Sequence, residues 1–152
     1  MTSGHQKSTA ARLAAANRAW RSKVGAALSG HGLHAGQEAV LLALGEADGL
    51  SMTELAGTLA VQPPTVTKMV ARLAAQGYVT RKASGSDGRQ AHVFLTRSGR
   101  GAIVGIDHVL KAVEREALAG IDDKDRRRLR RILRRVARNL VPNGPAREDD
   151  DD

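Results

Sequence analysis

Apolar side chains recur at steps of three and four residues along most of this chain, which is the spacing of one buried face on an α-helix. The pattern predicts four long helices, over about residues 9–29, 35–47, 98–118 and 122–140. Gly30 and Gly32 follow the first helix, and Asp48 and Gly49 follow the second. Because glycine adopts the backbone conformation that ends helices, these positions mark where the helices stop.

Two shorter helices are predicted between the second and third long ones. Ser51 and Glu54 have the spacing of a capping box, in which the hydroxyl and the carboxylate accept hydrogen bonds from free amides at a helix start. The first short helix therefore covers about 52–60. The next covers about 64–76, because it opens on two prolines, which a first helical turn tolerates, and it is followed by a glycine.

The pattern then changes to two short β-prone runs, at 78–83 and 91–96, with a polar, glycine-rich stretch at 85–90 between them. This arrangement predicts a β-hairpin with a long tip. Two short helices followed by a charged hairpin is the order of a winged helix-turn-helix, a DNA-binding unit that would run from about 51 to 96. The predicted fold class is mainly α with a small β-wing.

The second short helix has one apolar face, formed by Val66, Met69, Val70 and Leu73, which should pack on the helix before it. Threonine and lysine side chains on the other face can contact base edges or phosphates in the major groove, and the helix dipole favours phosphate at its start. The residues predicted to contact DNA from this helix and its entry are Gln62, Pro64, Thr65, Thr67, Lys68 and Arg72.

The tip of the hairpin supplies a second set of predicted DNA contacts: Ser86, Asp87, Arg89 and Gln90. An arginine at this position suits a narrow minor groove, where the negative potential is enhanced, so Arg89 is assigned there.

Charge agrees with this interpretation. The chain carries a formal net charge of +8, and since residues 147–152 carry −4, the remainder carries +12. A body with that charge attracts polyanions, because neutralising phosphates releases counterions. Nothing approaches the roughly 18 apolar residues of a membrane span or the core of a signal peptide, so no membrane partner and a cytoplasmic location are expected. Without cysteines, the chain has no thiolate metal site.

Several short runs of this chain occur together in one known family. They are Gly32-Leu33, Gln37, Leu55-Ala56, Val66 to Leu73, Gly77 to Arg81, Asp87 to Arg89 and Leu95 to Gly99. With the long helices on either side, the similarity covers about 9–140, and on these residues the chain resembles the MarR family of bacterial transcriptional regulators. The family's wing usually has a second arginine where this chain has Gln90.

The resemblance implies a homodimer in which the first and last helices of both subunits intertwine, with two wings straddling a near-palindromic operator on double-stranded DNA near the bacterial nucleoid. It also implies repression that is relieved by a small effector, often an aromatic or phenolic anion. No other cofactor is expected. Asp87 would brace the wing, for example by pairing with Arg72. Trp20 and His34 are the candidate effector-pocket residues. The candidate dimer residues are Leu13, Leu129, Ile132, Leu133, Val136 and Leu140.

The domain organisation follows from these assignments. Dimerisation helices are expected at 9–34 and 98–140, a winged helix-turn-helix at 35–97, and disordered ends at 1–8 and 141–152. The arginines of the last helix are interpreted as the solvated face of a dimer helix, and the five histidines are not assigned to a metal, since none has the i, i+4 spacing of a helical pair.

Three other functional classes can be compared with a DNA-binding regulator. An enzyme is not expected, because no nucleophile–base set or carboxylate pair stands out. A non-sequence-specific architectural DNA protein would use the same positive charge. A winged-helix protein-interaction module would use the same fold as a docking surface.

Overall fold

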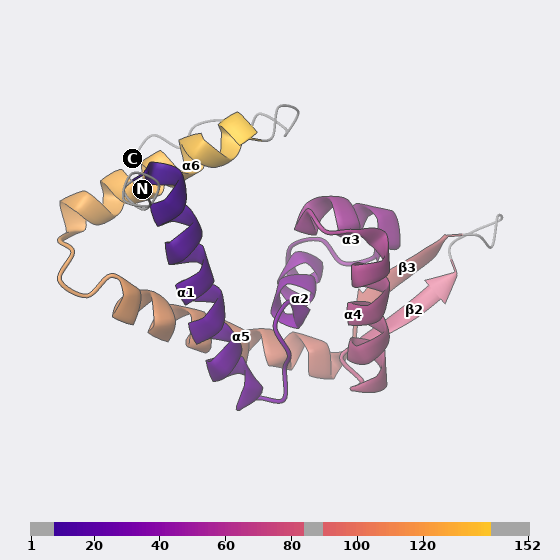
Figure 1. The fold of residues 1–152 in the computed structure, drawn as a ribbon. Coiled ribbons are helices and arrows are strands. Elements are labelled where there is room, and N and C mark those ends of the chain that lie inside the picture. Colours follow the sequence, from indigo (N-terminus) through magenta and orange to yellow (C-terminus); the bar gives the residue numbers. More distant parts are fainter. Residues whose placement is uncertain (1–7, 84–89, 141–152) are drawn as a thin grey trace, which may run out of the picture. The chain divides into compact units, whose positions relative to one another are not determined.

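The computed structural model describes residues 8–83 and 90–140 (Figure 1). These residues form two compact units that divide within the fifth helix, after Glu114. The elements are α1 (Thr9–Ser29), α2 (Gln37–Glu46), β1 (Leu50–Ser51), α3 (Met52–Leu59), α4 (Pro63–Ala75), β2 (Val79–Ala83), β3 (Ala91–Leu95), α5 (Arg97–Ala117) and α6 (Asp123–Leu140). The predicted fold class, mainly α with a small β-wing, is confirmed.

Local signals set most helix boundaries. The predicted capping box is present at the start of α3, where the Ser51 amide donates to Glu54 Oε2 at 2.7 Å and the Glu54 amide donates to Ser51 Oγ at 3.1 Å. Ser8 was expected in a disordered end, but its hydroxyl accepts a hydrogen bond from the Ala11 amide and caps α1. α2 starts two residues later than predicted, because Gly36 adopts φ +94°.

The sheet has three antiparallel strands in the order β1-β3-β2. β2 and β3 form the predicted hairpin, with Val79 opposite Leu95 and Ala83 opposite Ala91. β1 pairs Leu50 with Val93 on the other edge of β3. This strand was not predicted, since two residues are too few to show an alternating pattern.

One apolar core joins the elements of the first unit. α2, α3 and α4 pack on one another, and α4 also contacts β2, so the wing follows directly on the helix that should read DNA (Figure 1). α1 contributes Val24 and Leu28 to this core, and α5 contributes Ile106 and Val113. Side chains from five helices and both hairpin strands therefore fix α4 against the rest of the unit.

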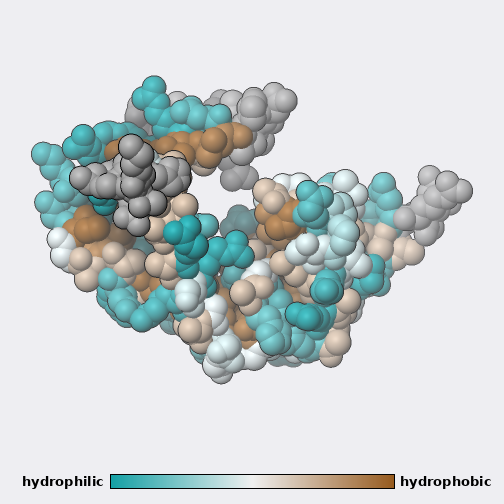
Figure 2. All heavy atoms as spheres, in the orientation of Figure 1, coloured by the Kyte–Doolittle hydropathy of each residue, from teal (hydrophilic) through white to brown (hydrophobic). Residues whose placement is uncertain are grey.

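The second unit contains α6, which begins at an Asp122 cap: its carboxylate accepts a hydrogen bond from the Asp125 amide at 2.8 Å. None of the α6 residues is buried within the chain. Ile132, Leu133 and Leu140 are 48%, 44% and 73% exposed, and Figure 2 shows the apolar stripe of α6 as a brown band beside hydrophilic side chains. Among the described helices, none is both long and apolar enough to cross a bilayer.

Candidate DNA-binding surface

The two faces of α4 differ as the sequence predicts. Val66, Val70 and Leu73 have no exposed surface, whereas Thr65, Lys68 and Arg72 are exposed. The buried face fixes the roll of the helix about its own axis, since rotating it would expose three large apolar side chains. As a result, a hydroxyl, an ammonium and a guanidinium lie together on the solvent side of one short helix.

The amino end of α4 is also exposed. Gln62 is the N-cap residue, Pro63 and Pro64 occupy the first two helical positions, and the Gln62 carbonyl accepts hydrogen bonds from the Thr65 and Val66 amides. Thr67 donates its hydroxyl to the Pro63 carbonyl at 3.0 Å, so its Oγ1 remains an acceptor and its methyl group remains a contact surface. Because the dipole makes this helix end partly positive, it favours a nearby phosphate.

The carboxyl end of α4 is held by a chain of amide hydrogen bonds. Gln37, which is 1% exposed, accepts from the His34 amide at 2.8 Å and donates its Nε2 to Gln76 Oε1 at 3.0 Å. Gln76 in turn donates to the Gly32 carbonyl at 2.8 Å. These bonds tie the residue that ends α4 to the loop between α1 and α2. The sequence did not predict this Gln37–Gln76 contact, because nothing in the local pattern indicates that two glutamines 39 positions apart share a hydrogen bond.

A small hollow of about 160 Å³ lies beside α4. Its lining residues are His34, Ala35, Gln37, Thr65, Lys68, Met69 and Arg72. Met69 forms its apolar side, and a Cβ at Gly36 would come within 2.6 Å of the Met69 methyl group, the movable end of that side chain; the φ of +94° at Gly36 is what favours glycine there. Predicted effector residue His34 and predicted DNA contacts Thr65, Lys68 and Arg72 therefore share one hollow.

A second hollow, of about 210 Å³, lies between the loop after α1 and the first turns of α5. Its lining residues are His31, Leu33, Tyr78, Gly101, Ala102, Gly105 and Ile106. Trp20, the other predicted effector residue, lines neither of these hollows and is partly buried against the core. A role for Trp20 in ligand binding stays a prediction.

The described part of the wing carries positively charged side chains on β2, the strand that contacts α4. Arg81 and Lys82 of β2 are exposed, and the Lys82 Nζ lies 5.3 Å from the centre of the Phe94 ring, in cation–π contact. Gln90 is exposed immediately before β3. Ser86, Asp87 and Arg89 lie outside the described residues, so the minor-groove contact and the pairing of Asp87 with Arg72 stay predictions.

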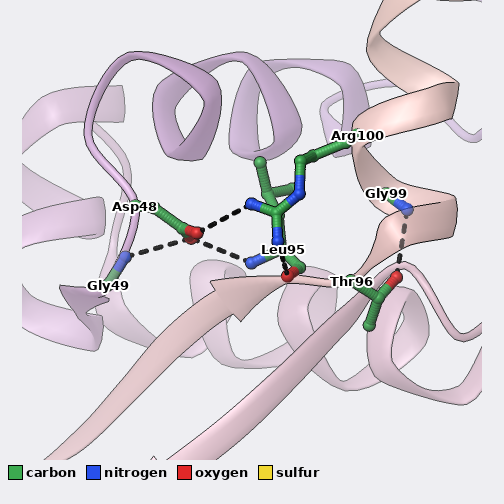
Figure 3. A network of polar contacts seen from close by, with 6 residues as sticks. All are labelled: Asp48, Gly49, Leu95, Thr96, Gly99 and Arg100. Atoms are coloured by element: carbon green, nitrogen blue, oxygen red, sulfur yellow. Dashed lines mark hydrogen bonds and ion pairs between the residues drawn. The ribbon is translucent and has the colours of Figure 1, made fainter.

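A polar network joins the base of the wing to α5 (Figure 3). Asp48 Oδ1 accepts from the amides of Gly49 and Leu95 at 3.1 and 2.9 Å, and its Oδ2 accepts from Arg100 at 3.2 Å. Arg100 also donates to the Leu95 carbonyl at 3.4 Å. Sequence reasoning treated Asp48 only as part of a helix stop. The structure shows that it holds the end of β3, and with it the base of the wing.

The hydroxyl of Thr96, next to the Asp48 network, fixes the start of α5. The Thr96 hydroxyl donates to the Gly77 carbonyl at 2.6 Å and accepts from the Gly99 amide at 3.0 Å. Gly99 is buried, and a Cβ there would overlap the carbonyl oxygen of Tyr78. α4, the hairpin and α5 are thus connected through hydrogen bonds and close backbone packing at one point.

The capping box of α3 has an electrostatic consequence. The hydrogen bonds that Glu54 accepts from the backbone and side chain of Ser51 lower the pKa of its carboxyl below the usual 4.5. The carboxylate is therefore the favoured form throughout the physiological pH range, and it satisfies the amide at the start of the first helix of the helix-turn-helix.

Comparison with known proteins places this geometry in a family. Residues 31–90 match the MarR family model, a stretch that holds α2, α3, α4 and β2. The chain is 33% identical over 116 residues to a helix-turn-helix transcriptional repressor of Mycobacterium bovis, covering 76% of this chain and 84% of that protein. It is 42% identical over 84 residues to the helix-turn-helix transcriptional regulator TtmR of Methylorubrum extorquens, where the match spans 55% of this chain and only 41% of that protein.

The fold has a counterpart among solved structures. CouR from Rhodococcus jostii, crystallised with p-coumaroyl-CoA, superposes with a TM-score of 0.78, covering 97% of this chain and all of that one at 21% identity. That identity supports a shared fold and no more. The relatives named here are transcriptional regulators and not enzymes. From the family match and the similarity to the mycobacterial repressor, this chain belongs to the MarR family of transcriptional regulators.

Proposed function

We propose that this protein is a dimeric repressor that binds a near-palindromic operator through the outward face of α4 in each subunit. One observation carries the proposal. Thr65, Lys68 and Arg72 project to solvent from a helix whose opposite face buries Val66, Val70 and Leu73 completely. A rigid helix that presents donors and positive charge on one side is the element that enters a major groove.

Dimerisation is supported by apolar surface that the single chain leaves uncovered. Leu13 of α1 is 41% exposed, and the α6 stripe of Leu129, Ile132, Leu133 and Val136 has no buried member. Contiguous exposed apolar side chains on a helix usually mark an interface. A two-fold dimer would present two copies of α4, and its operator would have half-sites about one helical turn apart, roughly 34 Å.

Release by an effector is supported by the hollow beside α4. It combines the apolar Met69 with the cationic Lys68 and Arg72, a lining that suits an aromatic anion. Such a ligand would occupy two cations that DNA also needs, so ligand and operator would exclude each other. The hollow is smaller than the roughly 300 Å³ at which drug-sized ligand pockets begin, so side chains would have to move on binding.

The DNA half of the proposal is tested by selecting duplexes from a random library with the dimer and measuring the selected sequence against a scrambled one at a fixed salt concentration. A repressor is expected to prefer the selected duplex by about 1,000-fold or more. Equal affinities would support an architectural DNA protein. No binding to either duplex at low salt would support a protein-interaction module.

The effector half needs a separate readout. The chain has a single tryptophan, so titration of aromatic carboxylates can be followed by Trp20 fluorescence without DNA. His34→Ala should weaken a ligand in the hollow beside α4, and His108→Ala, an exposed histidine of α5 outside both hollows, is the matched control. If none of the compounds changed either fluorescence or operator affinity, the effector half would be abandoned.

A further inference from the structure

α6 carries a dense positive face opposite its apolar stripe. Seven arginines project from this face, and all of them are exposed: Arg127, Arg128, Arg130, Arg131, Arg134, Arg135 and Arg138. Four of these lie along one line of the helix, at spacings of four, three and four residues: Arg127, Arg131, Arg134 and Arg138. We call these four the arginine row. At 1.5 Å per residue, the row is about 16 Å long.

The row has no acidic neighbour along its own helix. The acidic residues of α6, Asp123 and Asp125, stand in its first turn, and none follows from Arg126 to Leu140. Arginines three and four positions apart repel one another, which destabilises the helix unless an anion lies nearby. Arg126 lies outside the row, and its guanidinium donates to the carbonyls of Leu118 and Ile121.

The same polypeptide supplies the complementary charge. Residues 148–152 are one glutamate and four aspartates, joined to α6 by the seven residues 141–147. Seven residues can span at most about 23 Å, which is more than the row's length. Five acidic residues in extended form would cover about 13 Å, close to the length of the row. The linker also contains Pro142, Gly144 and Pro145, a composition that favours a turn over continuation of the helix.

We propose that the arginine row of α6 is a docking surface for the acidic segment 148–152 of the same chain. The tether gives the segment a local concentration near the millimolar range, so many weak ion pairs suffice to hold it without a fixed backbone conformation. Docking would occupy the row and keep it from DNA phosphates. Fewer cations would then be available to DNA phosphates outside α4 and the wing, which limits non-specific binding. Only this last consequence rests on the proposed function.

Docking itself is tested by paramagnetic NMR on the full chain. Since the sequence has no cysteine, Asp152→Cys provides a single position for a nitroxide label. At low salt, the label should broaden the backbone amide signals of residues 127–131. The broadening should disappear when Glu148 is changed to Gln and Asp149, Asp150 and Asp151 to Asn. It should also disappear at about 0.5 M salt, where exposed charges are screened within a few ångströms.

The consequence for DNA is tested with a random duplex, using a double-mutant cycle. Neutralising residues 148–152 should tighten binding to this duplex about fivefold at 50 mM salt and have little effect at high salt. In a variant with Arg127, Arg131 and Arg134 changed to Gln, the same neutralisation should change affinity less than about twofold. The matched control changes Arg12, Arg18 and Arg21 of α1 to Gln, where the full fivefold effect should persist.

The outcomes separate the two proposals. Broadening that is equally strong with the neutral segment would show that the label reaches residues 127–131 by chain length alone, and it would overturn docking. A fivefold effect that persists in the Arg127, Arg131 and Arg134 variant would show a general charge effect and would also overturn it. If docking is seen but the protein prefers no DNA sequence, the proposed function fails while the docking proposal stands.

Discussion

Gln37 and Gln76 share a hydrogen bond of 3.0 Å between two side-chain amides, although they lie 39 positions apart. The Gln37 side chain is buried, and its carbonyl oxygen holds the His34 amide while its nitrogen holds Gln76. The loop after α1 and the end of α4 are therefore joined by a polar contact that runs from the buried Gln37 to the exposed Gln76. A buried amide that lacks its hydrogen-bond partner lowers the free energy of unfolding, so removing either glutamine should destabilise the protein.

Gln76→Ala should destabilise the protein by about 1–3 kcal/mol, because it leaves the buried Gln37 Nε2 without its acceptor. Urea unfolding followed by circular dichroism measures this change. Gln90→Ala, at an exposed glutamine before β3, is the control and should stay within about 0.5 kcal/mol of the parent. Equal unfolding midpoints for the two variants would show that the Gln37–Gln76 hydrogen bond contributes nothing to stability.

Replacing each of two α5 glycines by alanine should change folding stability in opposite directions. At Gly99 a Cβ would overlap the Tyr78 carbonyl oxygen and lie 3.1 Å from the Leu95 Cδ2, so Gly99→Ala should destabilise by about 1–3 kcal/mol. At Gly101 nothing lies within 4 Å of a built Cβ, so Gly101→Ala should stabilise by up to about 1 kcal/mol through helix propensity. Thermal melts of the pair check the sign. A stabilising Gly99→Ala would contradict the close packing at this point.

Asp48 should contribute more to folding stability than Arg100, the arginine with which it pairs. Asp48→Ala removes the acceptor of the Leu95 amide at the end of β3 and should cost about 1–2 kcal/mol. Arg100 is 62% exposed, so Arg100→Ala should cost less than about 1 kcal/mol. Chemical unfolding of both variants measures the difference. Both variants lose the ion pair, so equal losses of stability would show that the ion pair is the main contribution and that the interpretation of Asp48 is wrong.

Glu54 should make stability depend on pH below neutrality. Its folded-state pKa is lowered by the hydrogen bonds from Ser51, so its contribution is present above pH 4.5 and is lost as the pH falls through the lower folded value. The Tm difference between the parent and Glu54→Gln should thus be constant near pH 7 and shrink towards pH 3. Glu46→Gln, at an exposed glutamate of α2, is the control for general charge effects. A Tm difference that does not vary with pH would contradict the assignment.

Local sequence signals account for most of the fold. The capping box at Ser51 and Glu54, the two prolines that open α4 and the apolar spacing of Val66, Val70 and Leu73 each act within a few residues, so they could be predicted and are confirmed. The outward position of Lys68 follows from the same spacing, because a helix with one buried face must expose the other.

The features that were missed depend on contacts between distant residues. β1 is two residues long and exists through its pairing with β3, and the Asp48 and Gln37 networks join segments 47 and 39 positions apart. Glutamine and aspartate are usually exposed, so composition gives no reason to expect that Gln37 is buried. The late start of α2 was also missed, because the apolar spacing does not reveal the positive φ of Gly36.

The central claim is that the outward face of α4 reads DNA, and Lys68 tests it most directly. Fluorescence anisotropy with a selected operator duplex should show Lys68→Ala binding about 5- to 100-fold more weakly than the parent, with a shallower salt dependence if Lys68 contacts phosphate. Lys111→Ala, an exposed lysine of α5 that carries the same charge, should bind within about twofold of the parent. Equal affinity of the Lys68 and Lys111 variants would contradict the account.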